Sequence, residues 1–266
     1  MPYTENTWTF RRSIEHEFGF SGNNGAKGEK RRKKHKPTPE QVKRQNQINK
    51  ENRMRRLIKA NFDVDDYWCT LKYPAGSRPG IDRVKKDFKN FTKKMQYAYK
   101  KYNQEYKYIY RIEVGKKGGV HIHIIINRIR DGPATDKLIR DKWVTHKVNY
   151  QQLDINEDYD ALAKYIVKEY EDDTQLSLFD IPDRKKLVRY DGSRNLIRPK
   201  PVKKIFKRRT MRKILEEGPK PTKGFYIDTD SIKQGVNPYT GRSFLKYTEI
   251  RIRGKLDETC QHIYRS

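Results

Sequence analysis

The sequence has little cysteine and no long apolar run. Its two cysteines, Cys69 and Cys260, do not form a CxxC pair, which argues against a disulfide scaffold and a cysteine-based zinc site. No run of about 18 apolar residues is present, which excludes a transmembrane helix. The start of the chain carries no secretory signal, so we expect a protein of a reducing cytoplasm.

Apolar residues and acidic charge are scarce as well. Only 34% of residues are hydrophobic while 36% are charged, which predicts a modest core with basic, partly unfolded extensions. The formal net charge of +27 exceeds what solubility needs and indicates a polyanionic partner. No basic amphipathic helix dominates the chain, so nucleic acid is favoured over a membrane surface.

Basic charge is concentrated in two segments. Residues 27–59 hold fourteen Lys or Arg against three Glu, and residues 198–213 hold nine Lys or Arg and no acid. We expect the first to be a mobile or helical arm and both to bind phosphates; a solvated surface helix is the alternative for the arm. The DNA contacts expected in these segments are Lys30, Arg31, Arg32, Lys33, Lys34, Lys203, Lys204, Lys207, Arg208 and Arg209.

The middle of the chain alternates between strand and helix patterns. Short runs rich in aromatic and branched residues predict strands at 67–73, 106–114, 120–126 and 147–153. Apolar spacings of three and four predict helices at 81–102, 134–141 and 157–172. This order predicts an α+β fold, in which a split βαβ core with an antiparallel sheet of the RRM or ferredoxin-like kind is flanked by helices.

The same patterns divide the chain into three parts. We expect an N-terminal extension with the basic arm (1–61), a catalytic domain (62–182) and a basic C-terminal extension (183–266). A hairpin is expected in the last part, from strands at 224–227 and 243–252 around the turn sequence at 237–241.

Two histidines lie inside an apolar strand, where alternate residues share a face. His121 and His123 therefore point the same way. If residues 115–119 form a hairpin loop, Val114 pairs with Val120 and Glu113 lies opposite His121, on the same face. Two imidazoles and a carboxylate suit Mg²⁺ or Mn²⁺, with zinc as an alternative in vitro. Locally hydrogen-bonded strand histidines are the alternative without a metal.

A tyrosine lies off the apolar stripe of the last predicted helix. Tyr165 is a poor choice for a core residue, and Lys168 follows it by one helical turn on the same face. A phenol has a pKa near 10, so a nearby ammonium or metal would favour its attack on phosphorus. We therefore expect Tyr165 to be a nucleophile and Lys168 to assist it.

These motifs, in their order, resemble those of HUH-superfamily Rep endonucleases. The resemblance rests on the WCTL run at 68–71, Glu113 with the HIH run at 121–123, and the YIVKE run at 165–169. It implies metal ligands at Glu113, His121 and His123, a single nucleophile at Tyr165 with Lys168 as its partner, and DNA contacts at Thr70 and Lys72. Tyr170 points elsewhere, because five residues are roughly 500° around a helix.

The resemblance implies nicking and joining of single-stranded or hairpin origin DNA in rolling-circle replication of a plasmid, phage or mobile element. Tyr165 would form a 5′-phosphotyrosyl link and leave a 3′-OH for a host polymerase, in a bacterial host. No GxxxxGK sequence followed by Ser or Thr is present, so unwinding would need a host helicase.

Three other interpretations stay open on sequence grounds. Transposases and conjugative relaxases of mobile elements use the same site chemistry, although relaxases commonly have a three-histidine cluster that this sequence lacks. A non-catalytic basic protein that coats nucleic acid would need only the charge. It would not need Glu113 in register with His121, or Tyr165 off its stripe.

Overall fold

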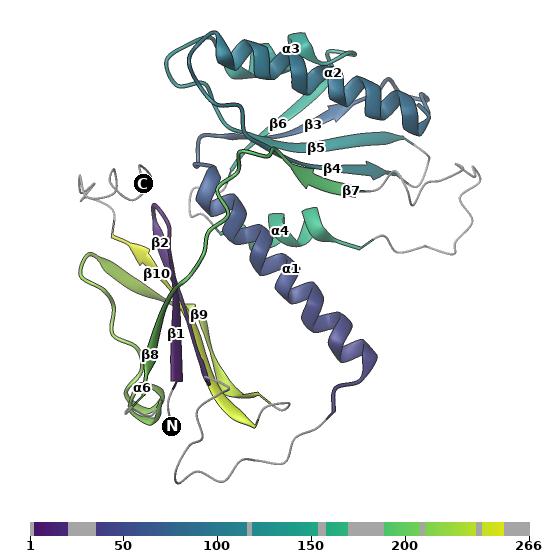
Figure 1. The fold of residues 1–266 in the computed structure, drawn as a ribbon. Coiled ribbons are helices and arrows are strands. Elements are labelled where there is room, and N and C mark those ends of the chain that lie inside the picture. Colours follow the sequence, from purple (N-terminus) through teal and green to yellow (C-terminus); the bar gives the residue numbers. More distant parts are fainter. Residues whose placement is uncertain are drawn as a thin grey trace. The chain divides into compact units, whose positions relative to one another are not determined.

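Two antiparallel β-sheets, each in a unit of its own, contain all the strands of the described residues (Figure 1). The computed structural model describes residues 3–20, 36–115, 119–153, 158–169, 189–207, 211–237 and 241–252. The chain divides into one unit of residues 47–198 and another of residues 1–46 with 199–266. None of the helices in these described ranges combines the length and the apolar character that a membrane span requires.

The unit of residues 47–198 contains the predicted strand and helix order. Its elements are β3 (Tyr67–Lys72), α2 (Ile81–Lys100), β4 (Tyr108–Val114), β5 (Val120–Ile126), α3 (Thr135–Lys142), β6 (Val148–Gln152), α4 (Asp160–Val167) and β7 (Arg189–Gly192). The sheet order is β6-β3-β5-β4-β7, with antiparallel neighbours throughout. Because β5 lies between β3 and β4, the predicted split βαβ core is confirmed. β7 is an additional edge strand.

Helices cover both faces of this sheet. One face packs against α2 and α3, in a core that includes Leu71, Ile112 and Ile122 with Phe91 and Met95 of α2. The other face packs against α4 and residues 47–61 of α1 (Pro39–Asn61). Figure 1 shows α2 and α3 on one side of the sheet and α4 on the other.

Residues 39–59 of the basic arm expected over 27–59 are helical, which is one of the two forms expected for it. Residues 21–35 lie outside the described residues, and a helix begins at Pro39. Its start is a capping box, in which the Gln41 amide donates to Thr38 Oγ1 at 3.3 Å and the Thr38 amide donates to Gln41 Oε1 at 2.9 Å. Met54 and Ile58 are buried, so the later turns of this segment are core structure.

Helix α4 is shorter than the predicted helix of 157–172. It ends at Val167, and Lys168 has the non-helical angles φ −52° and ψ 127°. Arg111 of β4 donates from Nη1 to the carbonyl oxygens of Ile166 and Lys168, at 2.9 and 2.8 Å. A side chain thus satisfies carbonyls that a further helical turn would otherwise have used. Residues 154–157 and 170–188 lie outside the described residues.

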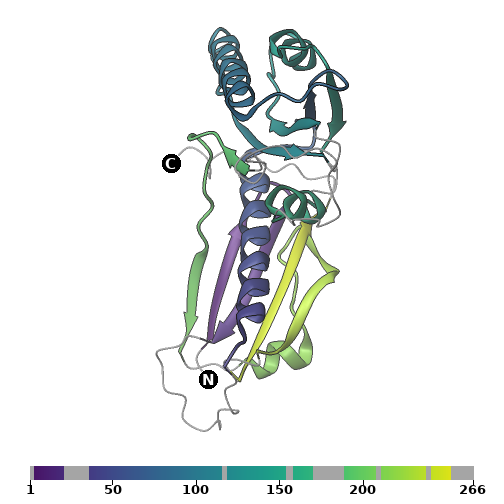
Figure 2. The ribbon, with the colours of Figure 1, turned by 90° about the vertical axis from the view of Figure 1, so that its right-hand side faces the viewer.

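The other unit differs from the predicted terminal extensions. The strands β1 (Tyr3–Thr9), β2 (Ser13–Phe20), β8 (Val202–Phe206), β9 (Phe225–Asn237) and β10 (Arg242–Arg251) form a second sheet in the order β8-β1-β2-β10-β9. Figure 2 shows β8 and β9 at opposite edges of this sheet. The expected C-terminal hairpin is confirmed, because β9 pairs with β10.

This second sheet changes the domain boundaries. The unit joins residues 1–46 to residues 199–266, whereas the sequence suggested separate parts at 1–61, 62–182 and 183–266. Tyr3, Phe18, Leu245 and Tyr247 share its core with Met211, which precedes the short helix α6 (Arg212–Glu217). Pairing between strands so distant in the sequence leaves no local pattern, which explains the difference.

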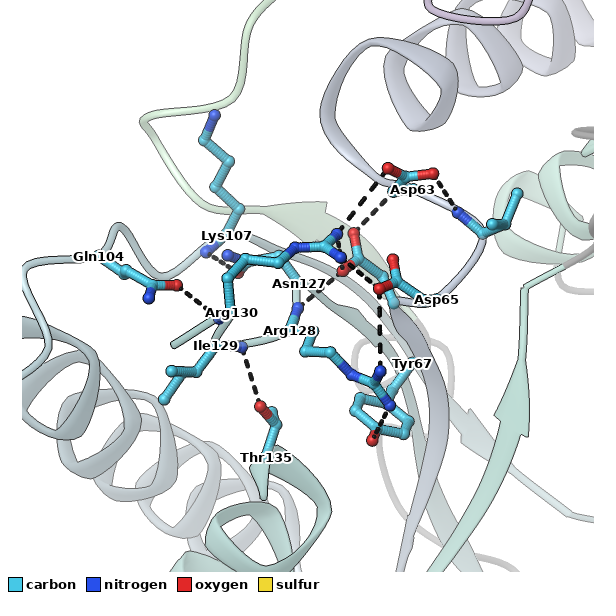
Figure 3. A network of polar contacts seen from close by, with 12 residues as sticks. Asp63, Asp65, Tyr67, Gln104, Lys107, Asn127, Arg128, Ile129, Arg130 and Thr135 are labelled. Atoms are coloured by element: carbon cyan, nitrogen blue, oxygen red, sulfur yellow. Dashed lines mark hydrogen bonds and ion pairs between the residues drawn. The ribbon is translucent and has the colours of Figure 1, made fainter. Parts of the chain in front are cut away.

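A polar network joins the start of β3 to the residues after β5 (Figure 3). Asp66 is buried, and its Oδ1 accepts a hydrogen bond from the Arg128 amide at 2.7 Å, while Oδ2 accepts one from the Asp63 amide at 2.8 Å. Arg128 also donates to the Tyr67 hydroxyl at 2.7 Å. Burial raises the pKa of Asp66 from 3.8 to about 6.

The raised pKa of Asp66 predicts a pH-dependent stability. The folded chain binds the proton of the Asp66 carboxyl more tightly than the unfolded chain does. The stabilisation from this proton is therefore complete below about pH 4 and is lost as the pH rises through about 6. Between pH 4 and 6.5, the free energy of unfolding of the wild type should fall relative to Asp66→Asn by on the order of 2 kcal/mol. Urea unfolding at both pH values tests this, with the exposed Asp82→Asn as control. Parallel pH curves for the wild type and Asp66→Asn would contradict it.

Candidate metal and nucleophile site

The register of β4 with β5 assembles the candidate site on the sheet face toward α4. Val114 pairs with Val120, Glu113 with His121 and Arg111 with His123, as expected for the strand hairpin. On the other side of β5, Thr70 of β3 lies opposite His123 and Lys72 opposite His121. Alternate residues of three strands therefore present the expected site residues on one face.

Glu113 and His123 come into direct contact. Oε2 of Glu113 lies 3.2 Å from Nε2 of His123, and both side chains are partly buried. His123 lowers the pKa of Glu113 to about 2 against the opposing effect of burial, and Tyr165 contributes further. The carboxylate is therefore ionised at neutral pH.

His121 lies beside this pair without joining it. The rings of His121 and His123 are 6.2 Å apart at 85°. Burial lowers the pKa of His121, with further effects from His123 and Lys72, so its imidazole is neutral and can act as a ligand at neutral pH. In the described part of the chain, no three His, Cys, Asp or Glu side chains already form a metal-binding group.

Tyr165 reaches the same point from α4. Its hydroxyl donates a hydrogen bond to Oε2 of Glu113. Its ring makes T-shaped contacts with the rings of His123 and Trp68, with centroids 5.1 and 6.0 Å apart. Burial, reinforced by Glu113, raises the pKa of Tyr165 above its ordinary value. The phenol is therefore neutral and its oxygen is fixed beside the carboxylate.

Lys168 does not share this position. It lies beyond the end of α4 with an exposed side chain, so it is not one helical turn after Tyr165 on the same face. Within the described part of the chain, no hydrogen bond or ion pair joins its ammonium to Tyr165 or Glu113. Its main chain is part of the site, because the Lys168 carbonyl accepts the bond from Arg111.

The sequence interpretation gave no role to two residues that position this site. Arg111 is buried, holds the end of α4 and lies 5.9 Å from the Tyr165 ring. Trp68 stacks on His123 at 5.6 Å and 21°. Strand parity contained the signal for Arg111, because it precedes Glu113 by two residues and must share its face.

The predicted DNA contacts are spread over the chain. Lys203 and Lys204 are exposed on the edge strand β8, and Lys207 follows that strand with an exposed side chain. Thr70 instead contacts His123, with Oγ1 3.1 Å from Nδ1. Several predicted contacts lie outside the described residues, namely Lys30, Arg31, Arg32, Lys33, Lys34, Arg208 and Arg209.

Replacing Arg111 should loosen the end of α4. Arg111→Met retains an unbranched side chain but leaves the Ile166 and Lys168 carbonyls without their donor, at a cost of about 1 to 3 kcal/mol. Hydrogen exchange measured by mass spectrometry should accelerate roughly tenfold or more in residues 160–168. Arg189→Met, which removes an exposed arginine from β7, should leave this exchange unchanged. Unaltered exchange in Arg111→Met would contradict the positioning role.

Comparison with known families adds evidence for this unit alone. Residues 66–171 match the family model described as replication-associated protein ORF2/G2P. The match runs from the start of β3 past α4 and includes Glu113, His121, His123 and Tyr165, but it covers less than half of the chain. Searches of curated proteins and of solved structures returned no match. Residues 66–171 are therefore similar to replication-associated proteins, a family that suggests a role in replication initiation.

Proposed function

We propose that this protein initiates rolling-circle replication by nicking and joining single-stranded DNA through Tyr165, with a divalent metal held beside it. One observation carries the proposal: the Tyr165 hydroxyl is hydrogen-bonded to Glu113, which also faces His123. The sequence suggested Tyr165, Glu113 and His123 from separate motifs, and these three side chains are in contact. The family match to a replication-associated protein agrees with this role.

The donor set fits Mg²⁺ or Mn²⁺. Two ligands about 2.1 Å from one octahedral ion, at right angles, are about 3 Å apart. The separation of 3.2 Å between Glu113 Oε2 and His123 Nε2 is close to that value. Nε2 of His123 is buried and has no hydrogen bond of good geometry within the described residues. His121 shares the face and would be the third ligand.

Thr70 would set the tautomer of His123. Its Oγ1 lies 3.1 Å from Nδ1, so a proton on Nδ1 can be donated to Thr70. The lone pair of Nε2 then faces Glu113 and can bind a cation. A fixed partner on the second ring nitrogen is the usual way in which a protein orients a histidine ligand.

The proposed reaction is a transesterification. The Tyr165 oxygen forms a bond to phosphorus, the bond from phosphorus to the 3′ oxygen breaks, and the phenol proton passes overall to that oxygen. The products are a 5′-phosphotyrosyl link and a free 3′-OH, and the reverse step rejoins the strand. A bound divalent cation would polarise the scissile phosphate and stabilise phenolate. Lys168 could assist from solvent, and its replacement by Ala should slow cleavage without abolishing it.

The origin DNA would be held by the basic surfaces. The exposed lysines of β8 and the exposed basic side chains of α1 supply phosphate contacts without sequence choice. A host helicase and a host polymerase would unwind and extend the nicked strand.

Tyr165→Phe tests the nucleophile directly. The substitution removes one oxygen and retains the ring, so folding and DNA binding should persist while the SDS-resistant protein–DNA adduct disappears. Tyr190→Phe is the matched control, because Tyr190 pairs with Arg111 on the same sheet face and is 38% exposed. An adduct that survives in Tyr165→Phe would end the proposal.

Metal binding can be measured without DNA. Mn²⁺ titrations followed by electron paramagnetic resonance should show a bound ion in Tyr165→Phe, as in the wild type. Its affinity should fall at least tenfold in His123→Ala and in Glu113→Gln, because each loses a ligand. Glu105→Gln, an exposed carboxylate of the same unit, is the control. Equal Mn²⁺ affinity in His123→Ala and Glu105→Gln would exclude a metal at this site.

A further inference from the structure

A polar groove of about 610 Å³ lies in the unit of residues 47–198, away from the Tyr165 site. One wall is the later half of α2, the other is the turn after β7, and the start of β4 lines it as well. The residues that carry the argument are Lys93, Gln96, Lys100, Tyr108, Arg194 and Asn195.

The groove is separate from the nucleophile site. Tyr108 begins β4 and packs against the core on the side of α2, whereas Glu113 lies five residues later on the opposite face. Five residues of a strand span roughly 17 Å. A ligand of the groove therefore does not occupy the Tyr165 site.

Cations dominate the groove lining. Lys93 and Lys100 are seven residues apart and lie on the same face of α2, while Arg194 lies in the opposite wall. All three side chains are exposed. The acidic residue of the lining, Glu105, has Oε2 3.6 Å from Nζ of Lys107. The groove therefore presents an excess of positive charge to a ligand, which favours a phosphate.

Carboxamides stand beside these cations. Gln96 and Asn195 line the groove together with Gln104. Asn195 donates from Nδ2 to the Tyr106 carbonyl at 3.3 Å, and Gln104 accepts from the Arg130 amide at 3.0 Å. The side-chain oxygen of Asn195 and the NH₂ group of Gln104 are therefore left to bind a ligand, and such groups pair with base edges.

The wall after β7 is preformed. The Ser193 amide donates to the Tyr108 carbonyl at 2.8 Å, and the Tyr108 amide donates to Ser193 Oγ at 3.2 Å. Gly192 packs so closely that a Cβ there would lie 3.0 Å from the Tyr108 carbonyl oxygen and 2.6 Å from Leu196 Cδ1. Arg194 and Asn195 are therefore carried on a turn that is fixed to β4.

We propose that this groove binds one flank of the single-stranded DNA substrate, with phosphates on Lys93, Lys100 and Arg194 and a base edge on the carboxamides. The volume lies in the range of sites for small ligands, so it admits a nucleotide unit of a strand and not a duplex. This inference rests on the proposed function, because the strand in the groove would be the one that reaches Tyr165.

The test compares two pairs of substitutions on α2 and at its C-terminal cap. Lys93→Gln/Lys100→Gln removes the charges that face the groove, and Lys94→Gln/Lys101→Gln removes two exposed lysines that do not line it. Binding of fluorescent oligonucleotides of increasing length is measured as a function of salt. For long strands the groove pair should bind roughly tenfold more weakly, with a salt slope reduced by about 1.4. Short oligonucleotides centred on the nick should bind both pairs equally.

Equal losses in the two pairs at every length would overturn the inference in favour of diffuse charge. Displacement of long strands from the groove by free dAMP, with no length dependence, would overturn it in favour of a nucleotide site. Adduct formation is followed in the same samples. If the wild type forms no adduct while the groove pair still loses long strands selectively, the Tyr165 chemistry fails and the groove stands. If the wild type forms the adduct while both pairs lose affinity equally, the groove proposal fails and the Tyr165 chemistry stands.

Discussion

The pairing register of β4 with β5 is the constraint on which the candidate site depends. Val114 opposite Val120 brings Glu113 beside His121 and Arg111 beside His123. A slip by one residue would turn Glu113 into the core formed with α2 and bring Ile112 to the site face, because side chains alternate along a strand. Burial of isoleucines on one face therefore fixes the positions of Glu113, His121 and His123 on the other.

Arg111 links this sheet to the helix that carries the tyrosine. Its guanidinium is buried and binds two carbonyls at the end of α4. Helix α1 braces α4 as well, through an ion pair of 2.7 Å between Arg55 and Asp160. The phenol oxygen is thus positioned by contacts from a strand and a helix, as the proposed nucleophile would require.

The sequence predicted the unit of residues 47–198 better than the unit that joins the two ends of the chain. Strand alternation gave the register at Glu113, and apolar spacing gave α2, because both patterns are local and strong. The predicted end of α4 was wrong, because the contact at that end comes from Arg111, which is far away in the sequence. The second sheet was missed for the same reason, because β1 pairs with β8 across most of the chain. Side-chain directions at His121 and Lys168 depend on packing that no local pattern contains.

The proposed function requires a covalent bond between Tyr165 and DNA. Mass spectrometry of the wild-type protein, digested with trypsin after reaction with origin DNA and Mn²⁺, can detect this bond. We expect a nucleotide attached to the peptide of residues 165–168, which trypsin releases by cleavage after Lys164 and Lys168. A nucleotide on any other tyrosine, or no linked peptide where the DNA has been nicked, would contradict it.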